Sequence, residues 1–191
     1  LFTVPPHEAI ASQANGEAAD LAKFRMVAVI GEPFYSITYG KGENARTVLV
    51  HAANGRVRDP INEQEARTIA TGMMHQPSDV AEVELVTKEA ISGHHEYREK
   101  PLPAWAITLK HPENATVYVG ANDGQVHAVR TNSWRAFDFL WMLHTMDFSG
   151  RDNINNYVLR AFSILGILTV MSGFLLYFVS SKTMRRIWKR R

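Results

Sequence analysis

Cysteine is absent from the 191-residue sequence, which excludes disulfide bonds, thiolate metal sites and cysteine nucleophiles. The patterns HExxH, GxSxG and SxxK are also absent, as is a phosphate-binding glycine loop. Spaced pairs of metal ligands are lacking, and we expect the adjacent His94, His95 and Glu96 to belong to a surface loop. The sequence therefore predicts a non-enzymatic protein with no catalytic residues, no metal site and no resident cofactor.

Basic residues outnumber acidic residues only at the C-terminus. Six of the 21 lysine and arginine residues lie in the last ten positions, 182–191, where no acidic residue occurs. The residues before this tail contain 15 basic and 19 acidic side chains. A nucleic-acid-binding protein concentrates basic charge on a folded face. Because the charge here forms a tail, we exclude nucleic acid as a partner.

One long run, Ala161–Val179, carries no charge and nothing more polar than Ser, Thr and Tyr. As a helix it would extend about 28 Å, close to the thickness of the bilayer hydrocarbon. A buried helix of a soluble protein is the alternative, but such helices rarely stay apolar on every face. The run predicts a transmembrane helix at 157–181, followed by a basic cytoplasmic tail at 182–191. We expect a bacterial cytoplasmic (inner) membrane protein whose folded part is periplasmic, and a first membrane helix before Leu1.

Small residues form a stripe on this predicted helix. Gly166, Thr169 and Gly173 recur at intervals of three and four residues, which places them on one face. Small residues let helices approach closely in lipid, although glycine and threonine are also common in membrane helices generally. The stripe predicts a membrane protein partner or a multi-subunit membrane complex, in addition to contact with the lipid bilayer.

The rest of the chain contains a duplication. TVLVHAANGRV (Thr47–Val57) returns 69 residues later as TVYVGANDGQV (Thr116–Val126). Upstream, PFYSIT at 33–38 returns as PAWAIT at 103–108. Matches of this density at a nearly constant spacing indicate a repeated module. We expect the polar, proline-rich stretch at 92–103 to be a long connection inside the second copy.

Both copies contain a two-residue hairpin turn ending in glycine, which readily adopts positive φ. The turn residues are Asn54, Gly55, Asp123 and Gly124. A helix-like segment precedes the strand-like segments in each copy, and a helix on one face of a small sheet is a stable arrangement. We therefore predict an α+β fold with two tandem modules, 1–60 and 61–131, each containing a helix and three to four antiparallel strands. We expect Tyr35 and Trp105 on exposed strands that invite pairing.

An aromatic helix is predicted between the second module and the membrane span. The residues on roughly one face of this helix are Trp134, Phe137, Trp141, His144 and Phe148. Tryptophan prefers the headgroup region of a bilayer, so 132–156 is predicted to be an interfacial helix and a bend, with Trp134 and Trp141 at the interface. Packing of the same helix on the second sheet is the alternative, and both can hold.

Three features in this order resemble the PepSY domain and the PepSY-associated transmembrane helix family. They are the hairpin with its AxxG turn, YREKPLPAWAI at 97–107 and LHTMDF at 143–148, ahead of a membrane helix. The resemblance covers nearly the whole chain and implies small α+β (PepSY-like) modules outside the cytoplasmic membrane, often in tandem. Members of the family accompany iron or siderophore uptake, flavin transfer, respiratory redox proteins and sensor kinases.

The resemblance leads us to expect an accessory or binding subunit of a membrane redox, flavin or iron-handling system. Larger family members that resemble ferric-siderophore reductases carry haem, but this chain has one membrane helix, no histidine inside it and no reductase domain. His144 could still ligate haem iron together with a histidine from a partner. A haem-binding electron-transfer subunit is therefore one alternative, and the sensory input subunit of a signalling system is another.

Overall fold

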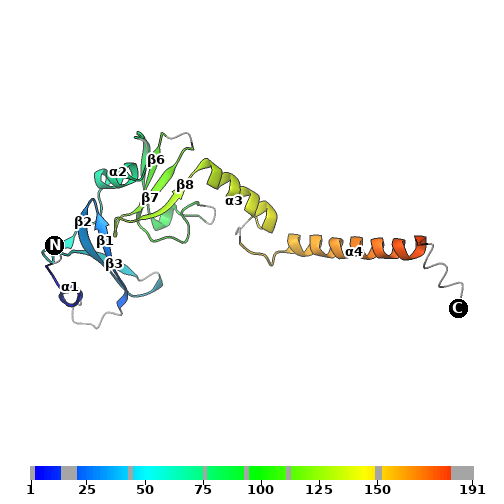
Figure 1. Cartoon of the computed structure of the whole chain (residues 1–191), viewed down its shortest axis with the longest axis horizontal. Coiled ribbons are helices and arrows are strands. Elements are labelled where there is room, and N and C mark those ends of the chain that lie inside the picture. The colour runs from blue at the N-terminus through cyan, green and yellow to red at the C-terminus, as the bar shows by residue number, and fades with distance from the viewer. Residues whose placement is uncertain are drawn as a thin grey trace. The chain divides into compact units, whose positions relative to one another are not determined.

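The computed structural model describes residues 3–13, 21–42, 45–74, 77–92, 95–110, 113–148 and 152–181. These residues form an α+β fold with two four-stranded antiparallel sheets and four α-helices (Figure 1). In chain order the elements are α1 (Pro6–Gln13), β1 (Leu21–Val29), β2 (Glu32–Tyr39), β3 (Arg46–His51), β4 (Val57–Arg58), α2 (Glu63–Gly72), β5 (Val80–Val86), the 3-10 helix η2 (Lys88–Ala90), β6 (Ala104–Leu109), β7 (Thr116–Gly120), β8 (Val126–Arg130), α3 (Asn132–Thr145) and α4 (Tyr157–Ser180).

The chain divides into two compact units, Leu1–Arg135 and Ala136–Arg191. Both sheets belong to the first unit, while most of α3 and all of α4 belong to the second. The predicted α+β class is confirmed. The module borders at 1–60 and 61–131 and the PepSY-like character of the modules stay predictions.

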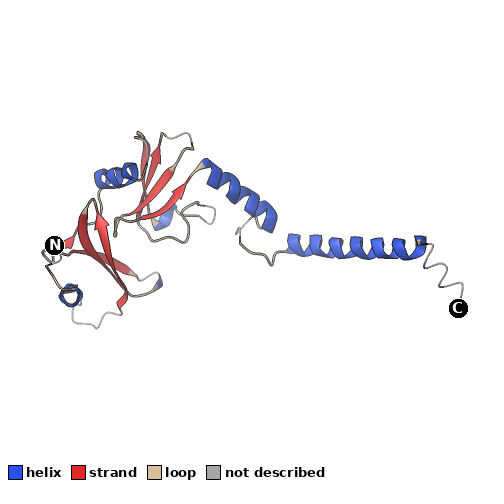
Figure 2. Cartoon of the chain, viewed as in Figure 1, coloured by secondary structure: helices blue, strands red, loops and turns tan. Residues whose placement is uncertain are grey.

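The two sheets repeat one another strand for strand (Figure 2). Their orders are β1-β2-β3-β4 and β5-β6-β7-β8, and all neighbouring strands are antiparallel. The first strand of each sheet is irregular at the same place. The register shifts between Leu21 and Lys23 in β1 and between Val80 and Glu82 in β5. A β-bulge kept at matching positions is a structural feature of both copies.

The hairpin turns are also alike. Gly55 has φ +70° and Gly124 has φ +61°, in the left-handed region that favours glycine. The side-chain oxygen of Asn54 accepts a hydrogen bond from the amide two residues later at 3.0 Å, and that of Asp123 does the same at 3.1 Å. The structure thus places the four predicted turn residues at equivalent hairpin tips.

The copies differ in the connection between their first two strands. In the first sheet, Ile30 and Gly31 make a tight turn with positive φ at both residues. In the second sheet, β5 ends at Val86 and β6 begins at Ala104, and the long connection between them contains the stretch predicted at 92–103. Its Tyr97 is fully buried and stacks on Tyr118 of β7, with ring centroids 4.5 Å apart. The connection therefore covers one face of the second sheet.

Each helix covers the equivalent face of its own sheet. In the first copy, Ala9 of α1 packs with the buried Tyr35 and Ile37 of β2. In the second copy, Ala66 and Ala70 of α2 lie in one cluster with residues of β6 and β7. Asn62 caps α2 and forms a reciprocal capping box with its third residue. This is the two-layer arrangement that the duplication predicts.

The expectation that Tyr35 and Trp105 are exposed is wrong. Both lie on strands with neighbours on either side, β2 and β6. Tyr35 is 2% exposed because α1 covers it, and its hydroxyl donates to the carbonyl of Val4 at 2.8 Å. Trp105 is half-buried and donates from Nε1 to the carbonyl of Ile61 at 2.7 Å. The edges of the sheets are formed by other strands.

The second unit is dominated by α4. Among the described residues, α4 is the one helix long and apolar enough to cross a membrane, and none of its apolar stretch is buried. It coincides with the predicted span at 157–181 to within one residue, and this agrees with a membrane-associated protein. The basic tail 182–191 lies outside the described residues.

Candidate functional site

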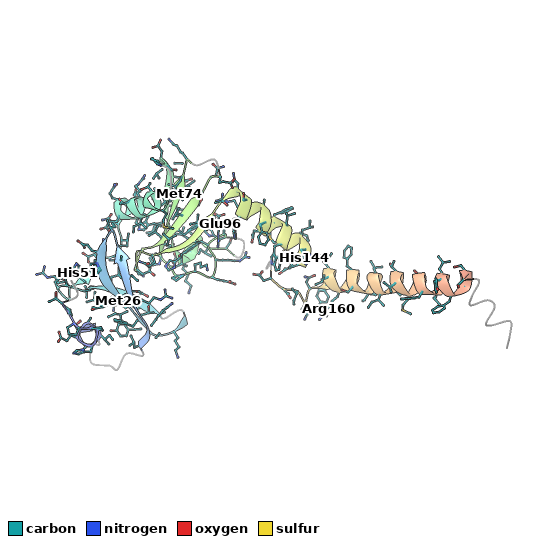
Figure 3. The ribbon with its side chains drawn as sticks, viewed as in Figure 1. Met26, His51, Met74, Glu96, His144 and Arg160 are labelled. Atoms are coloured by element: carbon teal, nitrogen blue, oxygen red, sulfur yellow. The ribbon has the colours of Figure 1, made fainter. Side chains whose placement is uncertain are left out.

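The most elaborate polar cluster is centred on Glu96, which lies in the long connection of the second copy (Figure 3). Arg135, in the first turn of α3, donates from Nε to Oε2 at 2.8 Å and from Nη2 to Oε1 at 2.9 Å. The hydroxyl of Tyr118 on β7 donates to the same Oε1 at 2.9 Å. A two-pronged arginine–carboxylate pair is among the stronger polar contacts in proteins. We call Glu96, Tyr118 and Arg135 the Glu96 cluster.

Further contacts of two arginines extend the Glu96 cluster. Arg135 also donates to the carbonyl of Asn114 at 2.9 Å and to the hydroxyl of Thr116 at 3.1 Å. Arg130 donates from Nε to the Glu96 carbonyl at 2.9 Å, and its guanidinium lies 3.9 Å from the ring centroid of Trp134. The first turn of α3 is therefore fixed to the second sheet. Trp134, predicted to lie at a membrane interface, is half-buried under Arg130.

The Glu96 cluster perturbs the acidity of its members. Burial alone would raise the pKa of Glu96, but the hydrogen bonds from Arg135 and Tyr118 and the nearby guanidinium charges together lower it. Burial, and then the hydrogen bond to Glu96, raise the pKa of Tyr118 far above its ordinary value. The hydrogen bond to Glu96 raises the pKa of Arg135. At neutral pH Glu96 and Arg135 are thus both charged, and neither is poised to exchange a proton.

A hollow of about 420 Å³ opens beside the Glu96 cluster on the sheet face opposite α2. Its lining is acidic and hydroxyl-rich, and consists of Glu82, Glu84, His95, Glu96, Ala106, Thr108, Thr116 and Tyr118. Within the described part of the chain, no group of three or more His, Asp or Glu residues is arranged to hold a metal ion. His94, the remaining member of the predicted surface loop, lies outside the described residues.

The histidines beside the two hairpins, His51 and His127, occupy positions that are not equivalent in the two copies. His51 ends β3, and Gly120 ends β7 at the equivalent place. A side chain on Gly120 would overlap the Asp123 carboxylate and would lie 2.5 Å from Nε2 of His127. Asp123 and His127 pair at 3.1 Å in that space. The pair stabilises the hairpin, and glycine is needed where it packs.

His144, the predicted haem ligand, is exposed in the last turn of α3 (Figure 3). Its ring centroid lies 6.1 Å from that of Trp141. The neighbouring Asp147 is instead 6% exposed, and it accepts a hydrogen bond from the amide of Asn153 at 2.9 Å. Met146, between them in sequence, has φ +53°. Asp147 belongs to the LHTMDF segment, in which the sequence pointed to His144 and not to Asp147.

Hydrogen bonds also hold the bend between α3 and α4. Asn156 caps α4 by accepting from the amide of Leu159 at 2.8 Å, and its Nδ2 donates to the carbonyl of Thr145 at 2.9 Å. Trp141 donates from its indole nitrogen to Asp152 at 3.1 Å. Trp141, predicted to lie at a membrane interface, therefore forms a hydrogen bond that stabilises the bend, and its ring remains exposed.

The small-residue stripe of α4 lies on a fully exposed helix. A Cβ atom added to Gly166 or Gly173 would meet no atom within 4 Å. The hydroxyl of Thr169 donates a hydrogen bond to the carbonyl of Leu165, one turn earlier in the helix, at 2.8 Å. The side-chain hydroxyl of the stripe is therefore already paired within α4. The predicted interface role of these three residues stays a prediction.

Comparisons with known proteins add little. No protein-family model and no curated protein matches this chain. A solved structure that matches is that of a candidate lipoprotein from Clostridium difficile 630, with 15% sequence identity and a TM-score of 0.27. The match covers 68% of this chain and 94% of that protein. A likeness at this level supports no assignment of fold or function.

Proposed function

We propose that this chain is a membrane-anchored accessory or binding subunit whose folded unit lies in the periplasm of a bacterium. Its partner would be a membrane redox, flavin or iron-handling system, as the resemblance to PepSY proteins implies. The observation that supports the proposal most directly is α4, which is apolar, fully exposed and 24 residues long. A helix of that length extends about 36 Å and needs lipid or another helix around it.

The geometry of the Glu96 cluster does not favour catalysis. Both carboxylate oxygens of Glu96 accept hydrogen bonds from Arg135, and Tyr118 occupies one of them as well. A general acid or base needs a pKa close to the working pH, whereas that of Glu96 is lowered. The cluster therefore serves to hold the first turn of α3 on the second sheet and gives no support to a reaction at this place.

The stripe on α4 offers a test of the partner. The full-length protein should co-purify with a membrane protein in mild detergent, and Gly173→Leu should release it while leaving membrane insertion intact. Ser172→Leu is the matched control, because it adds the same side chain one residue away, about 100° around the helix. A native chain that is monomeric in several mild detergents and crosslinks to no neighbour in membranes would contradict the subunit assignment.

The proposed orientation has its own test. A phosphatase that is active only outside the cytoplasm, fused after Arg191, should be silent on the intact chain. Removing the six basic residues of 182–191 should weaken that orientation, since a positive flank keeps the C-terminus inside. Strong phosphatase activity on the intact chain would place the tail outside and refute the proposed topology.

A haem-binding subunit is the second candidate, because the His144 imidazole is exposed and forms no hydrogen bond within the described residues. The second unit contains no other histidine, so a second axial ligand would have to come from a partner. Protein purified from membranes should then show a Soret band that disappears in His144→Ala. A colourless preparation would reject this candidate and leave the accessory subunit or, without a partner, a sensory subunit.

A further inference from the structure

The first strand of each sheet has no strand on its outer side among the described residues. β1 is an edge strand of the first sheet, and β5 is an edge strand of the second. The two strands are equivalent, because Lys23 lies opposite Thr38 of β2 and Glu82 lies opposite Thr108 of β6. Unpaired strand edges present backbone groups that can pair with another strand. Each copy of the module therefore offers an edge at its first strand.

The two edges carry opposite charges at matching positions. β1 presents Lys23 and Arg25, and β5 presents Glu82 and Glu84 in their places. All four side chains are exposed. Charges of either sign would keep a strand edge from aggregating. Protection from aggregation therefore does not explain why the two edges carry opposite charges. The reversal instead makes the two edges complementary to each other and repellent to themselves.

Both edges also expose an apolar side chain next to the charges. Met26 of β1 is 56% exposed, and Leu85, its equivalent in β5, is 42% exposed. They point to the opposite face of the strand from the charged residues, because side chains alternate along a strand. A strand paired on either edge would therefore cover apolar surface on one face and pair charges on the other.

We infer that β1 of one copy of this chain pairs with β5 of a second copy. An antiparallel register that sets Lys23 opposite Glu84 also sets Arg25 opposite Glu82, so both pairs are attractive. The acidic hollow beside Glu82 and Glu84, about 420 Å³, leaves room for the two long basic side chains. Pairing β1 with β1 or β5 with β5 would oppose like charges, which is unfavourable.

Two different edges meet in this contact, so after the first pairing one chain keeps its acidic edge free and the other keeps its basic edge free. Such a contact is heterologous and forms either a closed ring or an open row in the membrane. The eight strands from two modules would make one continuous sheet, with α1 and the partner copy's α2 on the same face. This inference goes beyond the proposed function and does not depend on which membrane protein α4 contacts.

Cysteine crosslinking tests the register, because the natural sequence has no cysteine to interfere. Two full-length chains with different tags, one carrying Arg25→Cys and the other Glu82→Cys, are produced together and oxidised in membranes. Residues directly opposite on antiparallel strands have Cβ atoms about 5 Å apart, close to disulfide geometry. We expect a disulfide between the two tagged chains. Pairs in which both chains carry Arg25→Cys, or both carry Glu82→Cys, are the matched controls and should crosslink far less.

Charge reversal provides a second test, measured as self-association of the full-length chain in mild detergent. Lys23→Glu together with Arg25→Glu should weaken association about tenfold, the size expected when two cross-strand pairs turn from attraction to repulsion. Adding Glu82→Lys and Glu84→Arg to the same chain should restore it, since complementarity returns with the signs exchanged. Equal crosslinking in the control pairs, crosslinks only to a different protein, or no recovery in the fourfold variant would each overturn the inference.

Discussion

Replacing Glu96 with glutamine removes one charge and almost no volume from the Glu96 cluster. Three side-chain hydrogen bonds converge on the carboxylate, two from Arg135 and one from Tyr118. A glutamine amide keeps one oxygen that can accept, but it turns an NH2 group toward a donor of Arg135 or Tyr118. Glu96→Gln therefore breaks at least one charged hydrogen bond and leaves a donor facing a donor.

The size of the loss follows from the surroundings of the pair. A hydrogen bond to a charged group contributes about 1.5–3 kcal/mol to stability. The side chain of Glu96 is 24% exposed and that of Arg135 35%, so solvent screens part of the interaction. We expect Glu96→Gln to lower the free energy of unfolding by about 2 kcal/mol, or the melting temperature by about 8 °C.

The same substitution should remove a dependence on pH. Because the folded-state pKa of Glu96 lies below its ordinary value of 4.5, the folded state binds this proton less readily than the unfolded chain does. The stabilisation is therefore complete above pH 4.5 and is lost as the pH falls through the folded-state pKa. The stability difference between the wild type and Glu96→Gln should shrink over that acidic range.

The assay is chemical denaturation of the full-length protein in mild detergent, followed by tryptophan fluorescence at neutral pH and at steps below pH 5. Trp134 lies against Arg130 and so should report on the Glu96 cluster. Glu99→Gln is the matched control, since it makes the same change on an exposed residue of the same connection. A loss no larger in Glu96→Gln than in Glu99→Gln, or a difference unchanged in acid, would refute this account of the cluster.

Three further substitutions test the hairpins and the bend by denaturation in mild detergent. Gly120→Ala should lower the free energy of unfolding by about 1–3 kcal/mol, because the added Cβ would push on the Asp123–His127 pair. Gly72→Ala is the control and should leave stability unchanged, because the space around Gly72 is open. Equal losses in the two variants would contradict crowding at Gly120. Gly124→Ala should cost more than Gly55→Ala, since both are strained at positive φ but only Gly124 would meet Val29 at 3.0 Å. Asp147→Ala should destabilise the bend by about 1–2 kcal/mol, whereas His144→Ala should not. A larger loss of stability in His144→Ala than in Asp147→Ala would make His144 the structural residue of LHTMDF.

Local signals explain why much of the fold could be predicted from the sequence. A glycine after Asn54 or Asp123 marks a hairpin because few other residues accept its φ, and both turns form where expected. Asn62 with Glu65 three residues later marks the start of α2. The absence of charge over nineteen residues marks α4. In each case the physical cause lies within a few residues of the effect.

The parts that could not be predicted depend on distant residues. Glu96 and Arg135 are 39 positions apart, and only the path of the long connection brings them together. Tyr35 was expected on an exposed strand because alternation shows that a strand has two faces but does not show which face a helix will cover. Asp147 was missed because a buried carboxylate in a bend resembles an ordinary polar loop residue until its amide partner, Asn153, is known.

The long connection makes the two copies of the module differ in what covers the sheet face away from the helix. In the first copy, the face away from α1 contributes Phe34 and Leu49 to a core shared with the second copy. In the second copy, the equivalent face is covered by the connection that replaces the Ile30-Gly31 turn. That connection supplies Tyr97 to fill the face and Glu96 to hold Arg135.

Shortening residues 87–103 to a two-residue turn should therefore expose Tyr118 and release the first turn of α3 while leaving the first sheet intact. Hydrogen exchange of the full-length protein should show faster exchange in β7 and at the start of α3, but not in β2. Unchanged protection at the start of α3 would mean that Glu96 is not what fixes the first turn of this helix to the second sheet.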